Sequence, residues 1–222
     1  KNVIRELATE ILSHLTGKKI KNLPKSLNSL SDKFDKVIIA KIKKKIKLFE
    51  TQKDIFDVIK EKNLIHKILL SKKIHGVISS MLGSDLQFQD RTEFIINHRD
   101  QEDNNYLFKK YHQEIWSGAS TNTILIWIPI FQKTKKGQMK LIRESHVWGH
   151  IPHHDKKPIE LPKKYTEISS NCNLGDAIVF HSMTLHRSEI LPKPHNVVGR
   201  LSLSVKNFKY PSTGFDNLSD WK

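Results

Sequence analysis

The segment YHQEIWSG, residues 111–118, places His112 and Glu114 two residues apart, just before a Ser-Gly turn and a long apolar run. We predict a β-strand here. Alternate residues of a strand share a face, so the imidazole and the carboxylate would point the same way. A neutral imidazole and a carboxylate together suit a borderline divalent ion such as Fe(II). The segment therefore offers two of the three protein ligands of a metal site.

The third ligand has two candidates, His181 and His186, in the run GDAIVFHSMTLHRS over residues 175–188. Two histidines and one carboxylate form a facial triad, which leaves open metal positions for oxygen and a co-substrate. An HxE pair alone is weak evidence because such pairs are common by chance. The residue types alone do not decide which of the two histidines is the third ligand.

The first 83 residues read as helices. Their apolar side chains recur at helical spacing, with Ser31 as an expected N-cap, Asp54 as the start of a further helix, and Gly17 and Gly83 as expected C-terminal stops. The stripes comprise Ile4, Leu7, Ala8, Ile11 and Leu15, then Phe34, Ile38, Ile42, Ile46 and Phe49, and finally Ile74, Val77, Ile78, Met81 and Leu82.

After Gly83 the pattern changes to short segments rich in β-branched and aromatic residues, bounded by turn signals at Gly137 and Gly175-Asp176. We predict strands over 87–97, 122–131, 139–146, 176–182 and 200–208. Helices first and strands later indicate an α+β class, with a β-sandwich or barrel wrapped by helices.

The bulk composition of the 222 residues is that of a globular protein, with 37% hydrophobic and 27% charged residues. The longest apolar run, over 124–131, is far shorter than the ~20 residues of a membrane helix, so no membrane span is expected. The single cysteine, Cys172, forms no intrachain disulfide and suits a reducing compartment, which predicts a cytoplasmic protein.

The net charge of +15 raises a second hypothesis, a non-catalytic basic jelly-roll protein that binds nucleic acid or another polyanion. Residues 1–80 carry 19 Lys/Arg against 8 Asp/Glu. Nucleic acid is disfavoured, because Arg is scarce, the lysines alternate with helical apolar positions, and neither zinc-finger spacing nor an RNP-type motif is present. A third interpretation makes the basic helices a recognition surface for an anionic substrate.

A longer pattern is more specific than HxE. GDAIVFHSMTLHRSEILPKPHNVVGRLSLS, residues 175–204, combines a turn, a buried strand, a histidine, and an arginine 14 residues later. This order resembles the phytanoyl-CoA dioxygenase-like family of Fe(II)/2-oxoglutarate oxygenases. SDLQFQDRTEFIIN, YHQE and STNTILIWIPIFQKTKKGQMKLIRESHVWG are similar to the family's upstream motifs, so the resemblance covers roughly residues 70–208.

The resemblance implies a double-stranded β-helix, a cupin-like jelly roll, with N-terminal helices packed on one sheet. It implies one oxygenase domain over 1–222, made of a helical part over 1–83, a jelly-roll core over 84–208 and a C-terminal tail over 209–222. The implied reaction hydroxylates a C–H bond of a small or carrier-linked metabolite, using Fe(II), 2-oxoglutarate and O2 and releasing succinate and CO2.

Residue by residue, the resemblance makes His112, Glu114 and His186 the iron ligands and leaves His181 a structural role. It makes Arg200 the partner of the distal 2-oxoglutarate carboxylate, a role that suits the planar fork of arginine. Ser202 shares the strand face of Arg200 and would add a hydrogen bond. Trp127 matches a tryptophan that lies beside the co-substrate.

The sequence departs from the family pattern at two positions. The family has HxD where this chain has HxE, so the longer Glu114 must fold back or its segment must shift. Glu144 stands where the family has a glycine. A retained carboxylate also favours hydroxylation, because halogenating relatives carry a small residue there.

Two further groups have open roles. His146, His150, His153 and His154 lie in HVWGHIPHHD, and they would form either a second metal site or, in the interpretation we favour, a loop over the active-site mouth. Lys110 and Tyr111 precede the metal motif and would be candidates to face the pocket.

Overall fold

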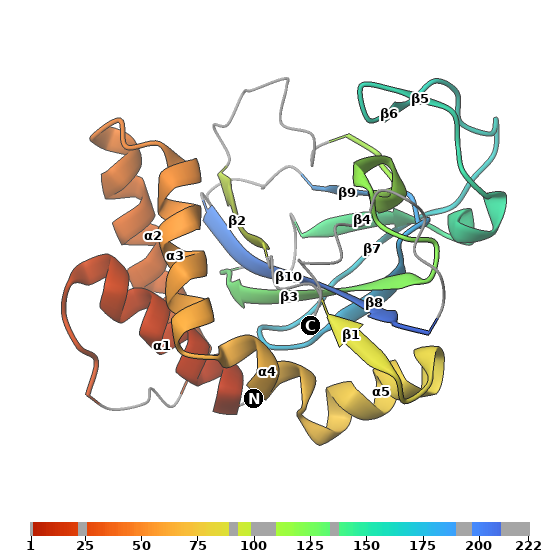
Figure 1. Ribbon diagram of the computed structural model, residues 1–222. Coiled ribbons are helices and arrows are strands. Elements are labelled where there is room, and N and C mark those ends of the chain that lie inside the picture. Colours follow the sequence, from red (N-terminus) through yellow and green to blue (C-terminus); the bar gives the residue numbers. More distant parts are fainter. Residues whose placement is uncertain are drawn as a thin grey trace.

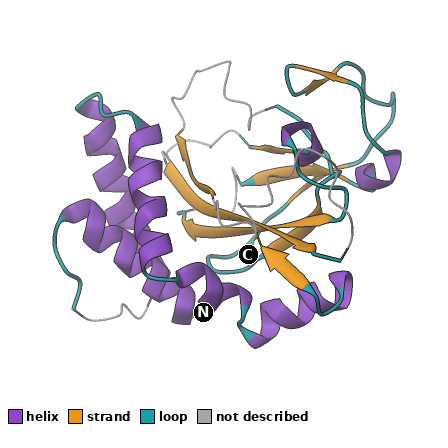
Figure 2. Cartoon of the chain, in the orientation of Figure 1, coloured by secondary structure: helices purple, strands orange, loops and turns teal. Residues whose placement is uncertain are grey.

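The computed structural model describes residues 2–21, 26–88, 93–98, 110–133, 138–189 and 197–209. Five helices come first: α1 (Asn2–Thr16), α2 (Leu27–Lys43), α3 (Leu48–Glu61), α4 (Leu64–Leu69) and α5 (Lys72–Leu82). Antiparallel strands follow, and Figures 1 and 2 show the helices gathered on one side of the sheets. Within the described ranges, none of the helices combines the length and apolarity needed to cross a membrane.

The strands form two main sheets and a hairpin. The larger sheet contains β1 (Leu86–Phe88), β2 (Glu93–His98), β3 (Thr123–Phe131), β8 (Ile178–His181) and β10 (Val197–Asn207). The smaller has the order β7 (Glu167–Ser169), β4 (Met139–Ile142), β9 (His186–Ser188). The hairpin joins β5 (His153–His154) to β6 (Lys157–Pro158). This is the predicted α+β arrangement, in which helices cover a two-sheet jelly roll.

Strand β3 explains the apolar run ILIWIPIF, because all nine of its residues are buried. Ile124, Ile126 and Ile128 face the helices, whereas Leu125 and Trp127 pack against Met139 and Leu141 of the smaller sheet and against Phe180 of the neighbouring strand β8. A strand covered on both faces needs no polar alternation, so its sequence is continuously hydrophobic.

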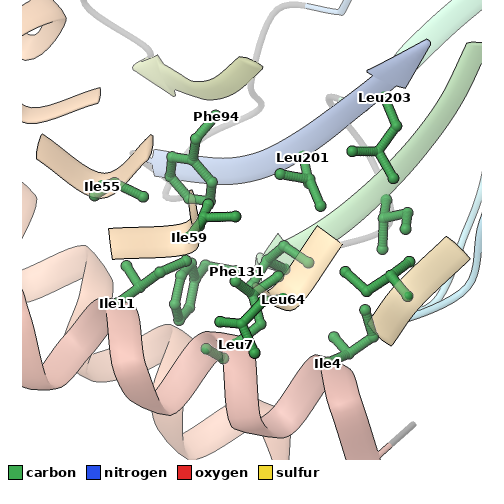
Figure 3. Packing of buried hydrophobic residues seen from close by; sticks show 14 of the residues in the cluster. Ile4, Leu7, Ile11, Ile55, Ile59, Leu64, Phe94, Phe131, Leu201 and Leu203 are labelled. Carbon is green, nitrogen blue, oxygen red and sulfur yellow. The ribbon is translucent and has the colours of Figure 1, made fainter. Parts of the chain in front are cut away.

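The main core lies between the helices and the larger sheet. Figure 3 shows side chains from α1, α3 and α4, among them Leu7, Ile59 and Leu64, pointing toward Phe94, Phe131 and Leu201 of the sheet. On the long strand β10, Leu201 and Leu203 face this core, so the alternating residues Arg200 and Ser202 face the other way, toward the smaller sheet. One face of β10 thus packs in the helical core, and its other face lines a pocket next to the smaller sheet.

Gly199 has no room for a side chain. A Cβ there would lie 2.9 Å from Cζ of Phe34, 2.9 Å from Cζ of Phe94 and 3.0 Å from Cδ2 of Phe131. The Phe34 and Phe131 rings are stacked with centroids 4.1 Å apart, so neither can move aside freely. The β10–β3 register also shifts between Gly199 and Arg200, which ties the direction of Arg200 to this contact.

Two local expectations were wrong. Ser26, and not Ser31, caps α2, since its side chain accepts a hydrogen bond from the Asn28 N–H. Ser31 lies inside the helix, where its hydroxyl accepts from the N–H of Gln132. Helix α3 begins at Leu48, ahead of Asp54. Local propensity favours either serine as an N-cap, and the hydrogen bond from Gln132, 101 positions later in the sequence, explains why Ser31 lies inside the helix instead.

Gly137 and, apart from Lys209, the tail over 209–222 lie outside the described residues.

We expect Gly199→Ala to lower the free energy of unfolding by about 1–3 kcal/mol, because the added methyl group overpacks three aromatic rings. Urea denaturation measures this change. The matched control is Gly76→Ala in α5, where nothing lies within 4 Å of the new Cβ. Alanine should stabilise that helix by up to ~1 kcal/mol. Equal stability of Gly199→Ala and wild type would contradict the packing argument.

Candidate metal centre

The backbone brings His112 and His186 together. The N–H of each donates to the carbonyl of the other, at 3.1 Å in both directions, which forms an isolated antiparallel bridge. The N–H of Glu114 donates to the carbonyl of Ser182 at 2.9 Å, and Glu114 begins a short 3-10 helix, η2 (Glu114–Ser117). The predicted strand through His112 and Glu114 was therefore wrong, because the chain bends into η2 after one bridged residue.

The three side chains nevertheless converge. Oε1 of Glu114 lies 3.5 Å from Nε2 of His112 and 3.2 Å from Nε2 of His186. One ligand atom from each residue lies within 4.8 Å of the others. Both histidines are only 6% exposed, so the group is enclosed. A bend of the backbone achieves the convergence that strand alternation was expected to give.

Backbone carbonyls set the tautomer of both imidazoles. Nδ1 of His112 lies 2.8 Å from the carbonyl of Lys110, and Nδ1 of His186 lies 2.9 Å from that of Thr184. A carbonyl only accepts, so Nδ1 carries the proton and the lone pair is on Nε2. Two lone pairs and a carboxylate oxygen then face one point, which is the donor set of a divalent cation.

The protonation states agree with this donor set. Burial, followed by the charge of His112, lowers the pKa of His186 and keeps its imidazole neutral at neutral pH. Burial acts to raise the pKa of Glu114, but the two histidines, when they carry the Nε2 proton that a cation would displace, outweigh burial and hold that pKa well below its ordinary value. A neutral imidazole and an ionised carboxylate are the forms that bind metal.

His181, the rival candidate, has its lone pair occupied. Its Nδ1 accepts a hydrogen bond from the Met183 N–H at 3.2 Å, and its side chain is also bonded to the backbone of Thr121. The ring therefore braces the turn that leads from β8 to His186. The geometry selects His186 as the partner of His112 and Glu114.

Arg200 lies in the same pocket and is only 4% exposed. Its Nη2 donates to Oγ of Ser188 at 2.6 Å, and its guanidinium lies 5.6 Å from the centre of a Trp127 ring. Ser202 also lines the pocket and stands opposite Trp127 in the β10–β3 register. The four predicted groups, namely triad, Arg200, Ser202 and Trp127, thus share one pocket.

Two polar residues of the pocket were missed from the sequence. Ser188 follows His186 by two residues on β9, so the alternation rule would have found it. Glu93 also lines the pocket, opposite Ser202 on β10. Although part of its side chain is exposed, burial of the rest, followed by the charge of Glu114, raises its pKa. Nothing in the sequence indicated that Glu93 lines the pocket, because Ser202, its partner in the β2–β10 register, is 109 positions away.

Gln113, the middle residue of HxE, is fully buried and joins three segments. Its Nε2 donates to the carbonyls of Gly149 at 3.0 Å and Met183 at 2.6 Å, and its Oε1 accepts from the Ile151 N–H at 3.0 Å. The side chain therefore fixes the metal loop against the β8–β9 turn and against the His-rich loop. Its amide fits because it supplies donors and an acceptor at once.

The remaining candidates have other surroundings. In the described part of the chain, the triad is the one group of three His, Cys, Asp or Glu residues close enough to share an ion, so the four histidines over 146–154 form no second metal site there. The His153 ring stacks on Trp116 at 4.6 Å. The Tyr111 hydroxyl bonds Glu167 of the smaller sheet, and Arg187 lies over its ring, 5.1 Å from the centre.

Comparisons with known proteins place this geometry in context. The model of the family described as Phytanoyl-CoA dioxygenase (PhyH) matches residues 24–190. The fold is similar to the apo structure of a non-heme monooxygenase, ThoJ, with a TM-score of 0.54 and 16% identity, covering 68% of this chain and 58% of that one. It is also similar to the epimerase SnoN in complex with Fe3+, alpha ketoglutarate and nogalamycin RO, with a TM-score of 0.51 and 16% identity, covering 70% and 68%. A search of curated proteins finds no match.

We expect His186→Asn to weaken Co(II) binding by more than the roughly 10–100-fold that loss of an outer partner causes, because a ligand atom is removed. His181→Asn is the matched control and should keep Co(II) affinity within that range or better. Titration followed by the visible Co(II) spectrum measures both. A larger loss of Co(II) affinity in His181→Asn than in His186→Asn would show that the wrong histidine was assigned as the ligand.

We expect Gln113→Leu to weaken Co(II) binding roughly 10–100-fold although Gln113 touches no metal, since the loop carrying two ligands loses its fixed position. The variant also leaves two carbonyls and an N–H without the amide, and each such loss costs about 1–3 kcal/mol of stability. Gln113→Glu keeps the acceptor for Ile151 but turns an oxygen that cannot donate toward two carbonyls, so it should also be destabilised in urea at neutral pH. Wild-type Co(II) affinity in folded Gln113→Leu would refute the positioning role.

Proposed function

Because the chain belongs to the phytanoyl-CoA dioxygenase (PhyH) family of Fe/2-oxoglutarate-dependent oxygenases, we propose that it is a dioxygenase that hydroxylates a C–H bond of a small or carrier-linked metabolite. The observation that carries this proposal is the buried His112, Glu114 and His186 triad in one pocket with Arg200. The chain covers 58% of the length of ThoJ, so activity, substrate and partners are all part of the proposal.

His112, Glu114 and His186 are proposed to hold Fe(II). Two imidazoles and a carboxylate match that ion, and the hydrogen bonds of Nδ1 to backbone carbonyls keep both Nε2 atoms aimed inward. The longer glutamate is accommodated by η2, because the bend after Gln113 moves the Glu114 backbone to a position from which its side chain still reaches both histidines.

Arg200 is proposed to bind the distal carboxylate of 2-oxoglutarate, with Ser188 and Ser202 as hydroxyl partners and the Trp127 ring alongside. The Ser188 hydroxyl already orients the guanidinium. A buried arginine beside polar groups pairs strongly with a carboxylate, since its planar fork makes two parallel bonds. Held there, the co-substrate would lie in the pocket that also contains the triad.

When bound, Fe(II) and 2-oxoglutarate supply the oxidising chemistry, in which O2 and 2-oxoglutarate yield a hydroxylated product, succinate and CO2. The protein's own part is to orient and to exclude water. Ile95, Met139 and Phe180 line the pocket with apolar surface, and the Phe180 ring lies 4.7 Å from that of His186. A dry wall limits side reactions of the oxidant.

A non-catalytic polyanion binder is the weaker proposal. It explains the +15 charge but gives no reason to enclose a carboxylate between two imidazoles. Burying these groups costs desolvation free energy unless they are paired or coordinate a metal ion. The cytoplasmic location inferred from the single cysteine stays a prediction.

The first test is anaerobic titration of the protein with Fe(II) and then 2-oxoglutarate, watching the weak visible charge-transfer band of the chelate. We expect the band in wild type, its loss in His112→Ala, and roughly tenfold to hundredfold weaker 2-oxoglutarate binding in Arg200→Gln, because a charge-assisted pair is removed. The exposed Arg143→Gln is the control and should bind 2-oxoglutarate like wild type. Folded wild-type protein without a band would reject the proposed cofactors.

A further inference from the structure

Glu93 lies at the opening of the metal pocket. It begins β2, where it pairs with Ser202 of β10. Residues that stand directly opposite each other on paired strands share a face of the sheet, and both of these residues line the pocket. Among the described residues that line it, Glu93 is the one with an exposed side chain, whereas Arg200 is 4% and His186 is 6% exposed. Solvent therefore reaches the pocket on the side of the Glu93 carboxylate.

This carboxylate has no protein ion partner at contact distance. In the described part of the chain, the charges of Arg200 and Lys156 act on Glu93, but neither side chain forms an ion pair with it. The Arg200 guanidinium instead donates to Oγ of Ser188 at 2.6 Å. The other acidic residue of the pocket, Glu114, is occupied by the two histidines of the triad. Glu93 is thus the pocket carboxylate that a bound molecule can use.

The pocket beside Glu93 also offers apolar surface. Ile95 follows Glu93 by two residues on β2 and lines the same pocket, as do Met139 and Phe180. The remaining polar side chains of the pocket are those proposed to hold the metal ion and 2-oxoglutarate. An occupant that contacts both Glu93 and these apolar side chains would carry a polar group on a carbon chain.

The proposed cofactors leave Glu93 as the excess charge of the pocket. Fe(II) and the Arg200 guanidinium together balance Glu114 and the two carboxylates of 2-oxoglutarate, so the charge of Glu93 is additional. Partly enclosed charges are screened less than charges in bulk water. A cation would also stabilise the ionised Glu93, against the burial of part of its side chain and the charge of Glu114, which raise its pKa. The loaded pocket therefore favours a positive group near Glu93 and disfavours an anion.

The lysine-rich helices lie on the other face of the sheet. They pack against Leu201 and Leu203 of β10, whereas Arg200 and Ser202 of the same strand face the pocket. Interactions between exposed charges are largely screened beyond about 8–10 Å at physiological salt. The net charge of +15 therefore does not predict the charge that the pocket prefers.

We propose that Glu93 binds a cationic nitrogen group of the substrate, either a protonated amine or a guanidinium, at the entrance of the pocket. The inference rests on the proposed function for the assignment of this pocket as the site of oxidation, and it names the class of substrate. A carboxylate accepts charge-assisted hydrogen bonds from either cation. Ile95 and Phe180 would contact the carbon chain that carries the cation, and the charge of Glu93 would reject an anion of the same shape.

The test compares four probes that share one butyl chain: butylammonium, butylguanidinium, butanol and butyrate. Ligand-observed NMR measures their dissociation constants for the full-length chain loaded with Zn(II) and 2-oxoglutarate, because Zn(II) keeps the charge of Fe(II) and has no redox chemistry. We expect wild type to bind at least one of the two cations about tenfold more tightly than butanol, since a charge-assisted hydrogen bond is roughly twice as strong as a neutral one. Butyrate should bind most weakly.

Three variants separate charge from shape. Glu93→Gln keeps the shape of the side chain and removes its charge, so it should lose most of the preference for the cation over butanol. Glu93→Asp keeps the charge and should retain part of that preference. The matched control is Glu61→Gln, which removes the same charge from an exposed position at the end of α3 and should change each affinity less than about twofold.

Each outcome decides the proposal. Tighter binding of butylammonium assigns an amine and tighter binding of butylguanidinium assigns a guanidinium, and both support the site if Glu93→Gln loses the preference. Equal binding of the cations and butanol by wild type overturns it, and so does an unchanged preference in Glu93→Gln. An equal loss in Glu61→Gln would attribute the preference to the net charge of the chain and would also overturn it.

The charge-transfer titration separates this inference from the proposed function. Glu93→Gln should keep the Fe(II)/2-oxoglutarate band, because Glu93 is not one of the proposed ligands. If wild type gives no band but still prefers a cation through Glu93, the proposed cofactors fail and the cation site stands. If the band is present and Glu93→Gln binds the cations like wild type, the cation site fails and the oxygenase assignment stands.

Discussion

The candidate site depends on one reciprocal backbone contact, the two 3.1 Å hydrogen bonds between His112 and His186. These residues are 74 positions apart, and no local rule brings them together. Once the bridge forms, their Nε2 atoms face the same point, and the neighbouring bond from Glu114 N–H to Ser182 brings in the carboxylate. The enclosed site is polar, so its groups must be satisfied by one another, by backbone, or by a cation.

The bridge is held by structure on both sides. His186 begins β9, which pairs with β4, and Leu141 of β4 stands opposite His186. His112 has no strand of its own, so Gln113 takes that role with three hydrogen bonds to two other segments. Arg200 is fixed independently, by a strand whose other face lies in the helical core. His186 and Arg200 thus belong to different sheets, and the sandwich sets the distance between them.

The sequence predicted the residue types of the site better than their local structure. The HxE pair, His186 and Arg200 came from spacing and resemblance, and their side chains meet in one pocket. The strand assigned to His112 and Glu114 was wrong, since a single bridge and a 3-10 turn produce the same convergence. The residue types left His181 and His186 open and the resemblance favoured His186, whereas the bond from the Met183 N–H that occupies His181 is not visible in the spacing. Strands β7 and β9 have three residues each, too few for a two-residue period to stand out.

The division between sheets and loops separates chemistry from selectivity. The triad and Arg200 lie on or beside sheet strands, where long-range pairing fixes their positions. The β5–β6 hairpin and the segment before His112 lie outside the two sheets. Loops tolerate change in sequence without loss of the core, so a fold of this kind can keep one oxidation and exchange the group that recognises the substrate. Gln113 links the two regions, because the same amide that fixes the ligand loop also holds Ile151 at the base of the hairpin.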